Sequence, residues 1–89
     1  MMPYIKTYLD HFEYKVLSDV ICEACGNQAA DVHHIHGRGK GKDVIDNLMA
    51  LCREHHEMAH SSKHYVSKDE FQLIHNYFLQ GQRKSFLKP

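Results

Sequence analysis

Two pairs of metal-binding side chains stand out in this sequence, Cys22-x-x-Cys25 and Cys52-x-x-His55. Thiolates and imidazoles at such spacing are the ligands of closed, tetrahedral zinc sites. The chain has three cysteines, all in these pairs, so a disulfide framework would leave one thiol over. The sequence therefore predicts a structural Zn²⁺ held by Cys22, Cys25, Cys52 and His55. Two alternatives stay open: the cysteines are unrelated core residues, or His56 is the fourth ligand.

A second set of side chains lies between and beside these pairs, namely His33-His34, Asn47 and His56. Histidine, with an ordinary pKa near neutrality, can take a proton from water. Imidazoles also hold divalent ions, which act as Lewis acids and stabilise a leaving oxygen. Hydrolysis of a phosphodiester needs both functions, so this set favours a metal-dependent nuclease.

In their order along the chain these residues resemble the HNH endonuclease family, specifically its members with a structural zinc. The resemblance covers about two fifths of the chain and rests on Cys22-Glu-Ala-Cys25-Gly, Asp31-Val-His-His34-Ile, Asp46-Asn47-Leu and Leu51-Cys52-x-x-His55-His56. It implies a small α+β fold, in which a ββα-metal (His-Me finger) core with a structural zinc site is flanked by N- and C-terminal helices. Small members of the family occur in phages, restriction systems and mobile elements, and the resemblance implies a phage-like setting.

The resemblance also implies roles for single residues. His34 is the general base, and Asn47 holds the loop and the ring of His34 by hydrogen bonds. His33 takes a metal-ligand position that is often aspartate in the family, and His56 is a second ligand. His60 lies four residues after His56, on the same helix face, and is either a third ligand or an exposed helix histidine.

Neutral imidazoles around one ion suit Zn²⁺, Ni²⁺, Co²⁺ or Mn²⁺ better than Mg²⁺, which prefers oxygen ligands. The predicted catalytic cofactor is therefore one divalent ion, Mn²⁺, Ni²⁺, Zn²⁺ or Mg²⁺. Adjacent side chains on a regular strand point to opposite faces, so joint action of His33 and His34 requires a twist or a strand end there. Asn47 is also typical of a turn, which is compatible with its implied role. The remaining histidines match no motif position and are predicted to be surface or packing residues: His11, His36, His64 and His75.

Charge is balanced, with eleven basic and eleven acidic side chains. Local cations in the glycine-rich loop, Arg38, Lys40 and Lys42, are predicted to contact phosphates, although such runs are also typical of flexible solvated loops. A second group of cations lies in the tail at 82–88. Acids crowd the middle of the chain (Asp31, Asp43, Asp46, Glu54 and Glu57). We therefore expect DNA affinity to be weak or to depend on a bound metal or a partner.

The length of 89 residues indicates one domain, 1–89, for which zinc is a suitable staple. A stripe of Ile5, Leu9, Phe12 and Val16 predicts an N-terminal helix over about 4–17, within the segment 1–20. The core, 21–61, is predicted to contain a strand at 29–35, a strand or irregular segment at 44–51, and a helix over about 52–61. A C-terminal helix at 66–81 is predicted from Ser67 and Glu70, a capping box, and from an apolar side formed by Phe71, Ile74 and Phe78.

The leading hypothesis is an HNH-type endonuclease that hydrolyses double-stranded DNA with little intrinsic specificity. A homodimer or a partner protein would supply specificity. Reduced thiols, together with the absence of an export signal or a membrane anchor, favour a cytoplasmic location. The alternative is a non-catalytic zinc-binding module that contacts nucleic acid or protein. Metal sequestration is less favoured, because the histidines are not in a tract.

Overall fold

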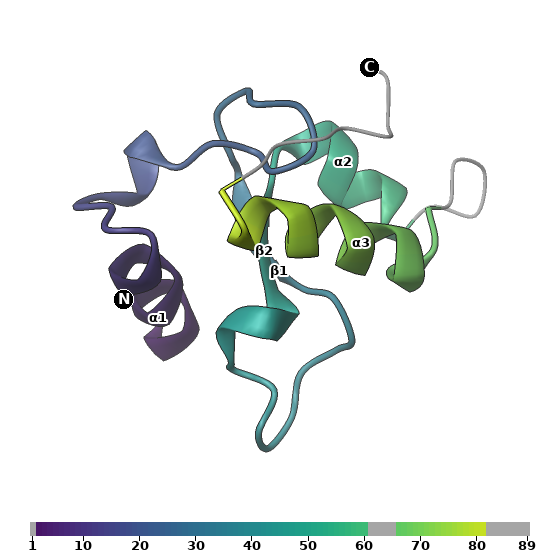
Figure 1. Cartoon of the computed structure of the whole chain (residues 1–89), viewed down its shortest axis with the longest axis horizontal. Coiled ribbons are helices and arrows are strands. Elements are labelled where there is room, and N and C mark those ends of the chain that lie inside the picture. Colours follow the sequence, from purple (N-terminus) through teal and green to yellow (C-terminus); the bar gives the residue numbers. More distant parts are fainter. Residues whose placement is uncertain (1, 61–65, 82–89) are drawn as a thin grey trace.

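At the centre of the molecule two short strands pair antiparallel, β1 (Asp31–His34) and β2 (Leu48–Leu51). The helix α2 (Arg53–Met58) follows β2 and packs against both strands. The computed structural model describes residues 2–60 and 66–81. The order strand, strand, helix confirms the predicted small α+β fold with a ββα core (Figure 1).

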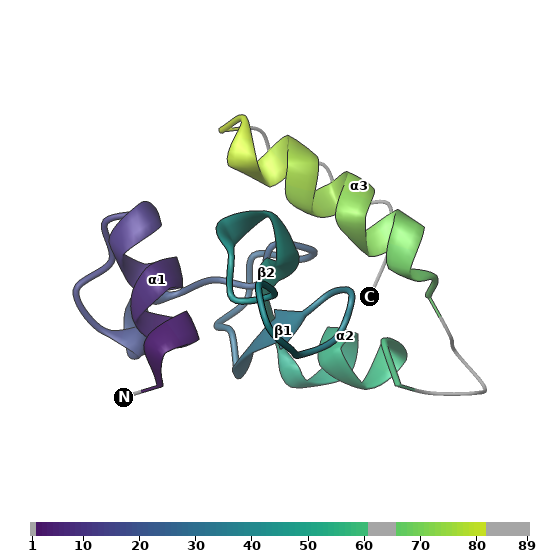
Figure 2. The same ribbon diagram turned by 90° about the horizontal axis from the view of Figure 1, so that it is seen from below.

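Two longer helices flank this core, α1 (Pro3–His11) and α3 (Lys68–Leu79). Figures 1 and 2 show α1 toward one end of the molecule and α2 and α3 toward the other, with the strands between them. In the described part of the chain, no helix has the length and apolar character needed to cross a membrane.

The two faces of the strand pair contribute to two hydrophobic clusters. All four residues of β2 are buried, because α1 covers one face and α3 the other. A strand that is buried on both faces has a continuous apolar sequence, as Leu48–Leu51 has. The cluster beside α1 contains Tyr8, Leu9, Val20, Val32, Leu48 and Ala50. The cluster beside α3 contains Cys22, Ala24, Ile35, Met49, Leu51, Val66, Phe71 and Ile74.

Helix α1 is shorter than the predicted 4–17. It ends at His11, and Glu13 has a left-handed φ of 61° that a continuing helix does not allow. The Tyr14 amide then donates to the Leu9 carbonyl at 2.9 Å, which turns the chain back. Val16, the last position of the predicted stripe, is 48% exposed. The rest of the segment 1–20 contains a short 3₁₀ helix, Leu17–Asp19.

Helix α3 lies inside the predicted segment 66–81, and its start agrees with the capping prediction. The Ser67 hydroxyl accepts a hydrogen bond from the Glu70 amide at 3.2 Å. Phe71 and Ile74 are buried, and Phe78 is partly buried. The helix is followed by Gly81 at φ 78°. The basic tail at 82–88 lies outside the described residues.

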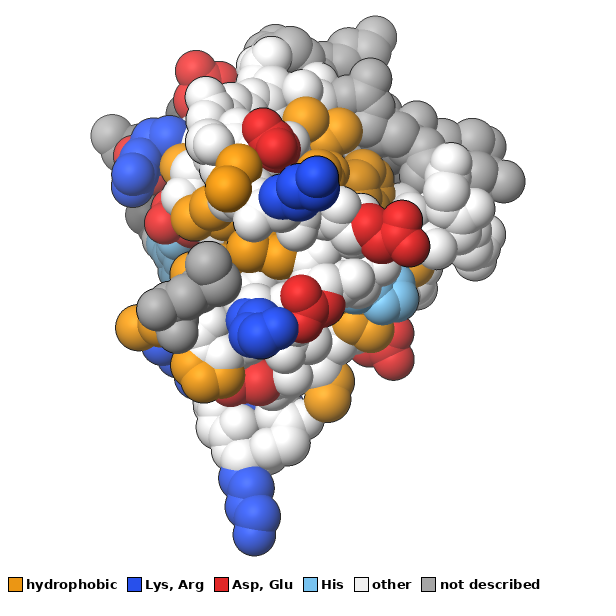
Figure 3. Space-filling view, turned by 90° about the vertical axis from the view of Figure 1, so that its left-hand side faces the viewer, with side chains coloured by type: hydrophobic (Ala, Val, Ile, Leu, Met, Phe, Trp, Pro, Cys, Tyr) orange, Lys and Arg blue, Asp and Glu red, His pale blue; other side chains and the backbone are white. Residues whose placement is uncertain are grey.

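The predicted segment 44–51 divides into a 3₁₀ turn, Ile45–Asn47, and the strand β2. The glycine-rich loop that precedes this turn projects at the bottom of Figure 1. Figure 3 shows the face beside α1, on which acidic, basic and apolar side chains are interspersed. On this face the acidic and basic side chains are mixed rather than separated into patches. A basic side chain lies at its lower tip.

Candidate metal centres and active site

The first cluster brings Cys22, Cys25, Cys52 and His55 together, with all their ligand atoms within 4.8 Å of one another. The Sγ atoms of Cys25 and Cys52 are 3.8 Å apart. Nδ1 of His55 lies 3.2 Å from Sγ of Cys52 and 3.8 Å from Sγ of Cys22. Around a tetrahedral ion with Zn–S bonds of about 2.3 Å and a Zn–N bond of about 2.0 Å, two sulfurs lie about 3.8 Å apart and a sulfur and a nitrogen about 3.5 Å apart. The donor set and its spacing therefore fit zinc.

A tight turn and a helix start build this cluster. The Cys22 amide donates to the Asn27 carbonyl at 2.6 Å, and the Gly26 amide donates to the Cys22 carbonyl at 2.9 Å. Gly26 takes a φ of 83°, which lets the chain wrap around the two thiols. Cys52 is the N-cap of α2, so His55 lies one turn further along that helix.

The surroundings of these ligands favour a bound cation. Burial raises the pKa of the Cys22 thiol to about 12 and lowers the pKa of His55. A thiolate in such a place needs a divalent cation beside it, whereas a neutral imidazole is already in its ligating form. Among the described residues, Nε2 of His55 is the buried side-chain nitrogen without a hydrogen-bond partner. Because Nδ1 of His55 faces the cysteine sulfurs, His55 is the histidine that joins the cysteines, whereas His56 belongs to another cluster.

A second cluster consists of His33 on β1, His56 on α2 and His60 just beyond α2. Their ligand nitrogens also lie within 4.8 Å of one another. Nε2 of His56 is 3.3 Å from Nε2 of His60, and the ring centroids of His33 and His56 are 5.1 Å apart. Two nitrogens bound to one tetrahedral ion at about 2.0 Å would lie about 3.3 Å apart. The three imidazoles therefore have the spacing of ligands to a single ion, and His60 is in place to be one of them.

Asp31 holds His56 in a ligating orientation. Its Oδ2 lies 2.9 Å from Nδ1 of His56, so Nε2 of that ring is left for the cluster. A carboxylate behind a metal-binding histidine fixes the tautomer and the orientation of its ring. Asp31 and His33 are two residues apart on β1 and therefore lie on the same face of the strand. This spacing is the sequence signal that could have placed Asp31 beside the histidine cluster.

The imidazole of His33 is in the form that binds metals. Burial, followed by the nearby rings of His56 and His60, lowers the pKa of His33 to about 4. The ring is therefore neutral at pH 7, with a lone pair free for an ion.

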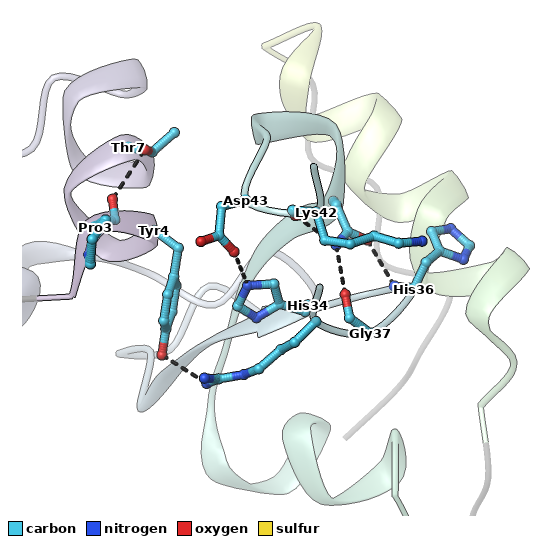
Figure 4. A network of polar contacts seen from close by, with 10 residues as sticks. Pro3, Tyr4, Thr7, His34, His36, Gly37, Lys42 and Asp43 are labelled. Atoms are coloured by element: carbon cyan, nitrogen blue, oxygen red, sulfur yellow. Dashed lines mark hydrogen bonds and ion pairs between the residues drawn. The ribbon is translucent and has the colours of Figure 1, made fainter. Parts of the chain in front are cut away.

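His34 points to the other face of β1, as strand alternation requires. Its Nε2 lies 2.7 Å from Oδ1 of Asp43, and its ring meets the ring of Tyr4 edge-on at 4.6 Å between centroids. Figure 4 shows Asp43 and Tyr4 against two sides of the His34 ring. Because β1 ends at His34, both neighbouring histidines still border the same cleft.

Asn47 closes the base of the glycine-rich loop. Its Oδ1 accepts from the His36 amide at 2.8 Å, and its Nδ2 donates to the carbonyls of Gly37 at 3.2 Å and Lys42 at 2.9 Å. The family resemblance also implied hydrogen bonds from Asn47 to the ring of His34. In the structure the partner of that ring is Asp43, and Asn47 bonds to the loop backbone.

A cleft of about 350 Å³ opens between the α1 side and the ββα core. The three histidines of the second cluster and His34 all line it, together with Tyr4, Ile5, Leu17, Gly37 and Arg38. Arg38 reaches across it, since its Nη2 donates to the Tyr4 hydroxyl at 3.1 Å. Lys40 and Lys42 are exposed on the loop outside the lining.

Sequence reasoning missed a buried polar network next to the cysteines. Oε1 of Glu23 lies 2.6 Å from Nδ1 of His75, while its Oε2 accepts hydrogen bonds from the Tyr8 hydroxyl and, at 3.2 Å, from the Ala50 amide. Nε2 of His75 lies 2.6 Å from the Ile45 carbonyl. The network connects the cysteine turn with both flanking helices, and no local spacing in the sequence signals it.

Within this network, Glu23 and His75 each stabilise the charged form of the other. Burial opposes the charge on His75, but the hydrogen bond and the negative charge of Glu23 outweigh it and raise the pKa of His75. Burial also opposes the charge on Glu23 and so raises its pKa, while hydrogen bonds from His75 and Tyr8 act to lower it. Because both side chains are fully buried, each depends on the other for its partner.

The family model described as HNH endonuclease matches residues 22–62. This match supports membership of the HNH endonuclease family. The match includes both metal-ligand clusters, His34 and Asn47, whereas α1 and α3 lie outside it. Searches of curated proteins and of solved structures returned no match. An HNH domain indicates a nuclease-type, metal-binding function.

Proposed function

We propose that this HNH domain is a metal-dependent endonuclease that hydrolyses phosphodiester bonds of DNA. One observation carries the proposal: His34 and the cluster of His33, His56 and His60 line a single cleft. A base and a metal-ligand set that border the same space can act on the same phosphodiester. Family membership supports this type of reaction.

In this mechanism His34 is the general base. A water molecule gives a proton to the ring of His34 while its oxygen forms a new bond to phosphorus. The bond from phosphorus to the 3′ oxygen breaks, and that oxygen leaves with the bonding electrons and takes a proton from solvent. Asn47 has an indirect role, since its hydrogen bonds hold the backbone of the loop beside the cleft.

His33, His56 and His60 would hold the catalytic divalent ion. When bound, such an ion supplies positive charge for the phosphate and the leaving oxygen. Three nitrogen donors favour Mn²⁺, Ni²⁺ or Zn²⁺ over Mg²⁺. Cys22, Cys25, Cys52 and His55 would hold a separate structural Zn²⁺.

The substrate proposed is double-stranded DNA, with phosphate contacts from Arg38, Lys40 and Lys42 on the exposed loop. Phosphate contacts position a nuclease without reading bases, so little intrinsic specificity is expected. A homodimer or a partner protein would have to supply any further sequence specificity.

Plasmid nicking tests the proposal. The purified protein, stripped of loosely held metal, is resupplied with Mg²⁺, Mn²⁺, Ni²⁺ or Zn²⁺ and incubated with supercoiled DNA. His34→Ala runs alongside, and His36→Ala is the matched control because His36 lies in the same segment with an exposed side chain.

The expected result is metal-dependent conversion of supercoiled DNA to the nicked form. The rate should fall by about 10²–10⁴-fold in His34→Ala and stay unchanged in His36→Ala. No cleavage with any of the four ions, by folded protein that carries one zinc, would contradict the proposal. That outcome would favour the alternative of a non-catalytic zinc module.

A further inference from the structure

We propose that Asp43 is a positioning residue for His34, a carboxylate that fixes which ring nitrogen carries the proton and which one faces the reaction. The catalytic consequence of this inference rests on the proposed nuclease function. The effect of Asp43 on the His34 ring is independent of that function, because it follows from the contact between the two side chains alone.

The contact between the two side chains is short and well placed. Oδ1 of Asp43 lies 2.7 Å from Nε2 of His34, and the side chain of His34 is only 5% exposed. A carboxylate accepts a hydrogen bond and cannot donate one when ionised, so Nε2 of the neutral ring must carry the hydrogen. The lone pair then belongs to Nδ1. A general base needs one such nitrogen in a fixed direction.

The ring of His34 is also held from α1. The Tyr4 ring packs edge-on against it at 4.6 Å, and the hydroxyl of Tyr4 accepts a hydrogen bond from Arg38. Tyr4 limits the tilt of the imidazole, but an aromatic edge does not select a tautomer. Only Asp43 among these neighbours makes a polar contact to a ring nitrogen of His34.

Backbone contacts place Asp43, whose own side chain is 53% exposed. The carbonyl of Lys42, directly before it, accepts a hydrogen bond from Nδ2 of Asn47 at 2.9 Å. The backbone amide of Asn47 in turn donates to the carbonyl of Val44, the residue directly after Asp43, at 2.9 Å. Asn47 thus brackets Asp43 on both sides. This arrangement carries the effect of Asn47 to His34 through the loop.

Two other roles for Asp43 fit the contacts less well. In the described part of the chain, its carboxylate belongs to neither group of ligand atoms that lie close enough to share an ion. A solvated loop acid would not need a 2.7 Å contact to a nearly buried imidazole. Position and contact both assign Asp43 to His34.

The first test measures the tautomer directly, without substrate. Two-bond ¹⁵N–¹H correlation spectra of the zinc-loaded protein distinguish an Nε2–H imidazole from an Nδ1–H imidazole. His34 is expected to be in the Nε2–H form, and Asp43→Ala is expected to shift it toward a mixture of the two forms. Asp19→Ala, at another exposed aspartate, is the matched control and should leave the signal unchanged.

The second test is kinetic, by single-turnover nicking with saturating metal. We expect Asp43→Ala to lower the cleavage rate by about 10–100-fold, as for other carboxylates that orient a functional histidine, with half-saturating DNA concentration unchanged. In a His34→Ala background, Asp43→Ala should cause no further loss, because Asp43 acts through His34.

An unchanged His34 tautomer in Asp43→Ala would overturn the inference. An additional loss of cleavage in the His34→Ala background would also overturn it, since Asp43 would then act on something else. If the wild-type protein cuts no DNA, the proposed nuclease function fails, while the spectra still decide whether Asp43 sets the ring.

Discussion

The two ligand clusters of this molecule differ in donor type and in access. The first has three sulfurs and one nitrogen, with Cys22 and His55 buried. The second has three nitrogens and borders a cleft, with His60 exposed. A closed set of four soft donors is typical of structural zinc, whereas an incomplete set facing a cleft leaves positions for water or substrate. The comparison separates a cluster suited to an ion that would stabilise the fold from one suited to an ion that would act on a substrate.

Helix α2 joins the two clusters. His55 and His56 are neighbours on it, yet His55 belongs to the first cluster and His56 to the second. Consecutive helix positions differ by about 100° around the axis, so one helix can face two centres. Zinc at the first cluster would fix the rotation of α2 and, through it, the directions of His56 and His60. The closed site thereby supports the open one.

The largest effect is expected at the closed cluster. Cys52→Ala removes a proposed zinc ligand, and structural zinc contributes about 10–16 kcal/mol to the folding of small domains. Since that equals or exceeds the whole stability of most domains, we expect this variant to be unfolded. Zinc content and circular dichroism melting check the prediction. A Cys52→Ala protein that melts cooperatively at the wild-type temperature would show that the cluster is not structural.

The open cluster should respond in the opposite way. His56→Ala removes one of the three proposed metal ligands, so we expect nicking to fall by about 10²–10⁴-fold, the range seen for lost catalytic groups. Zinc content should stay at one ion, and the melting temperature should stay within a few degrees. The metal concentration for half-maximal nicking should rise. Loss of the structural zinc in His56→Ala would mean that the two clusters are not separate.

The buried network beside the cysteines sharpens the comparison, because it stabilises the fold without contributing a ligand. Glu23→Ala removes the carboxylate partner of the buried His75 imidazole, and breaking such a buried pair costs about 3–5 kcal/mol. Urea unfolding of the zinc-loaded protein measures this change, with the exposed Glu54→Ala as control. A change below about 1 kcal/mol would show that the pair contributes little to holding the flanking helices.

The smallest effect is expected in the glycine-rich loop. Lys40 is exposed there, and its loss should weaken DNA binding uniformly and reduce the slope of log affinity against log salt by about 1. Fluorescence anisotropy with labelled duplexes at several salt concentrations measures that slope. Lys15→Ala, an exposed lysine after α1, is the control. Equal slopes for Lys40→Ala and wild type would remove this loop from the DNA contact.

Local spacing explains what the sequence could predict. The cysteine pairs, the spacing of His56 and His60, and the cap at Ser67 are relations within a few residues, so they are visible without a fold. The contacts of Asp43 with His34 and of Glu23 with His75 join residues that only the folded chain brings together. The end of α1 depends on the left-handed residue Glu13, for which the apolar stripe gave no signal.

The acids in the middle of the chain illustrate the same limit. From the sequence, Asp31 and Asp43 counted as charges that weaken DNA binding. In the structure each lies within hydrogen-bond distance of a histidine of the candidate site, His56 and His34. Their charges are therefore partly engaged in orienting those rings, and the net charge of the chain understates what the cleft offers to a phosphate.

The most direct test of separate structural and catalytic ions counts bound metal and measures nicking in the same sample. Protein dialysed against a mild chelator is analysed by native mass spectrometry and assayed on supercoiled plasmid before and after addition of Mn²⁺. We predict a folded protein with one zinc and no activity, in which a second ion restores nicking. Full nicking by protein that holds one zinc and no second ion would contradict the account.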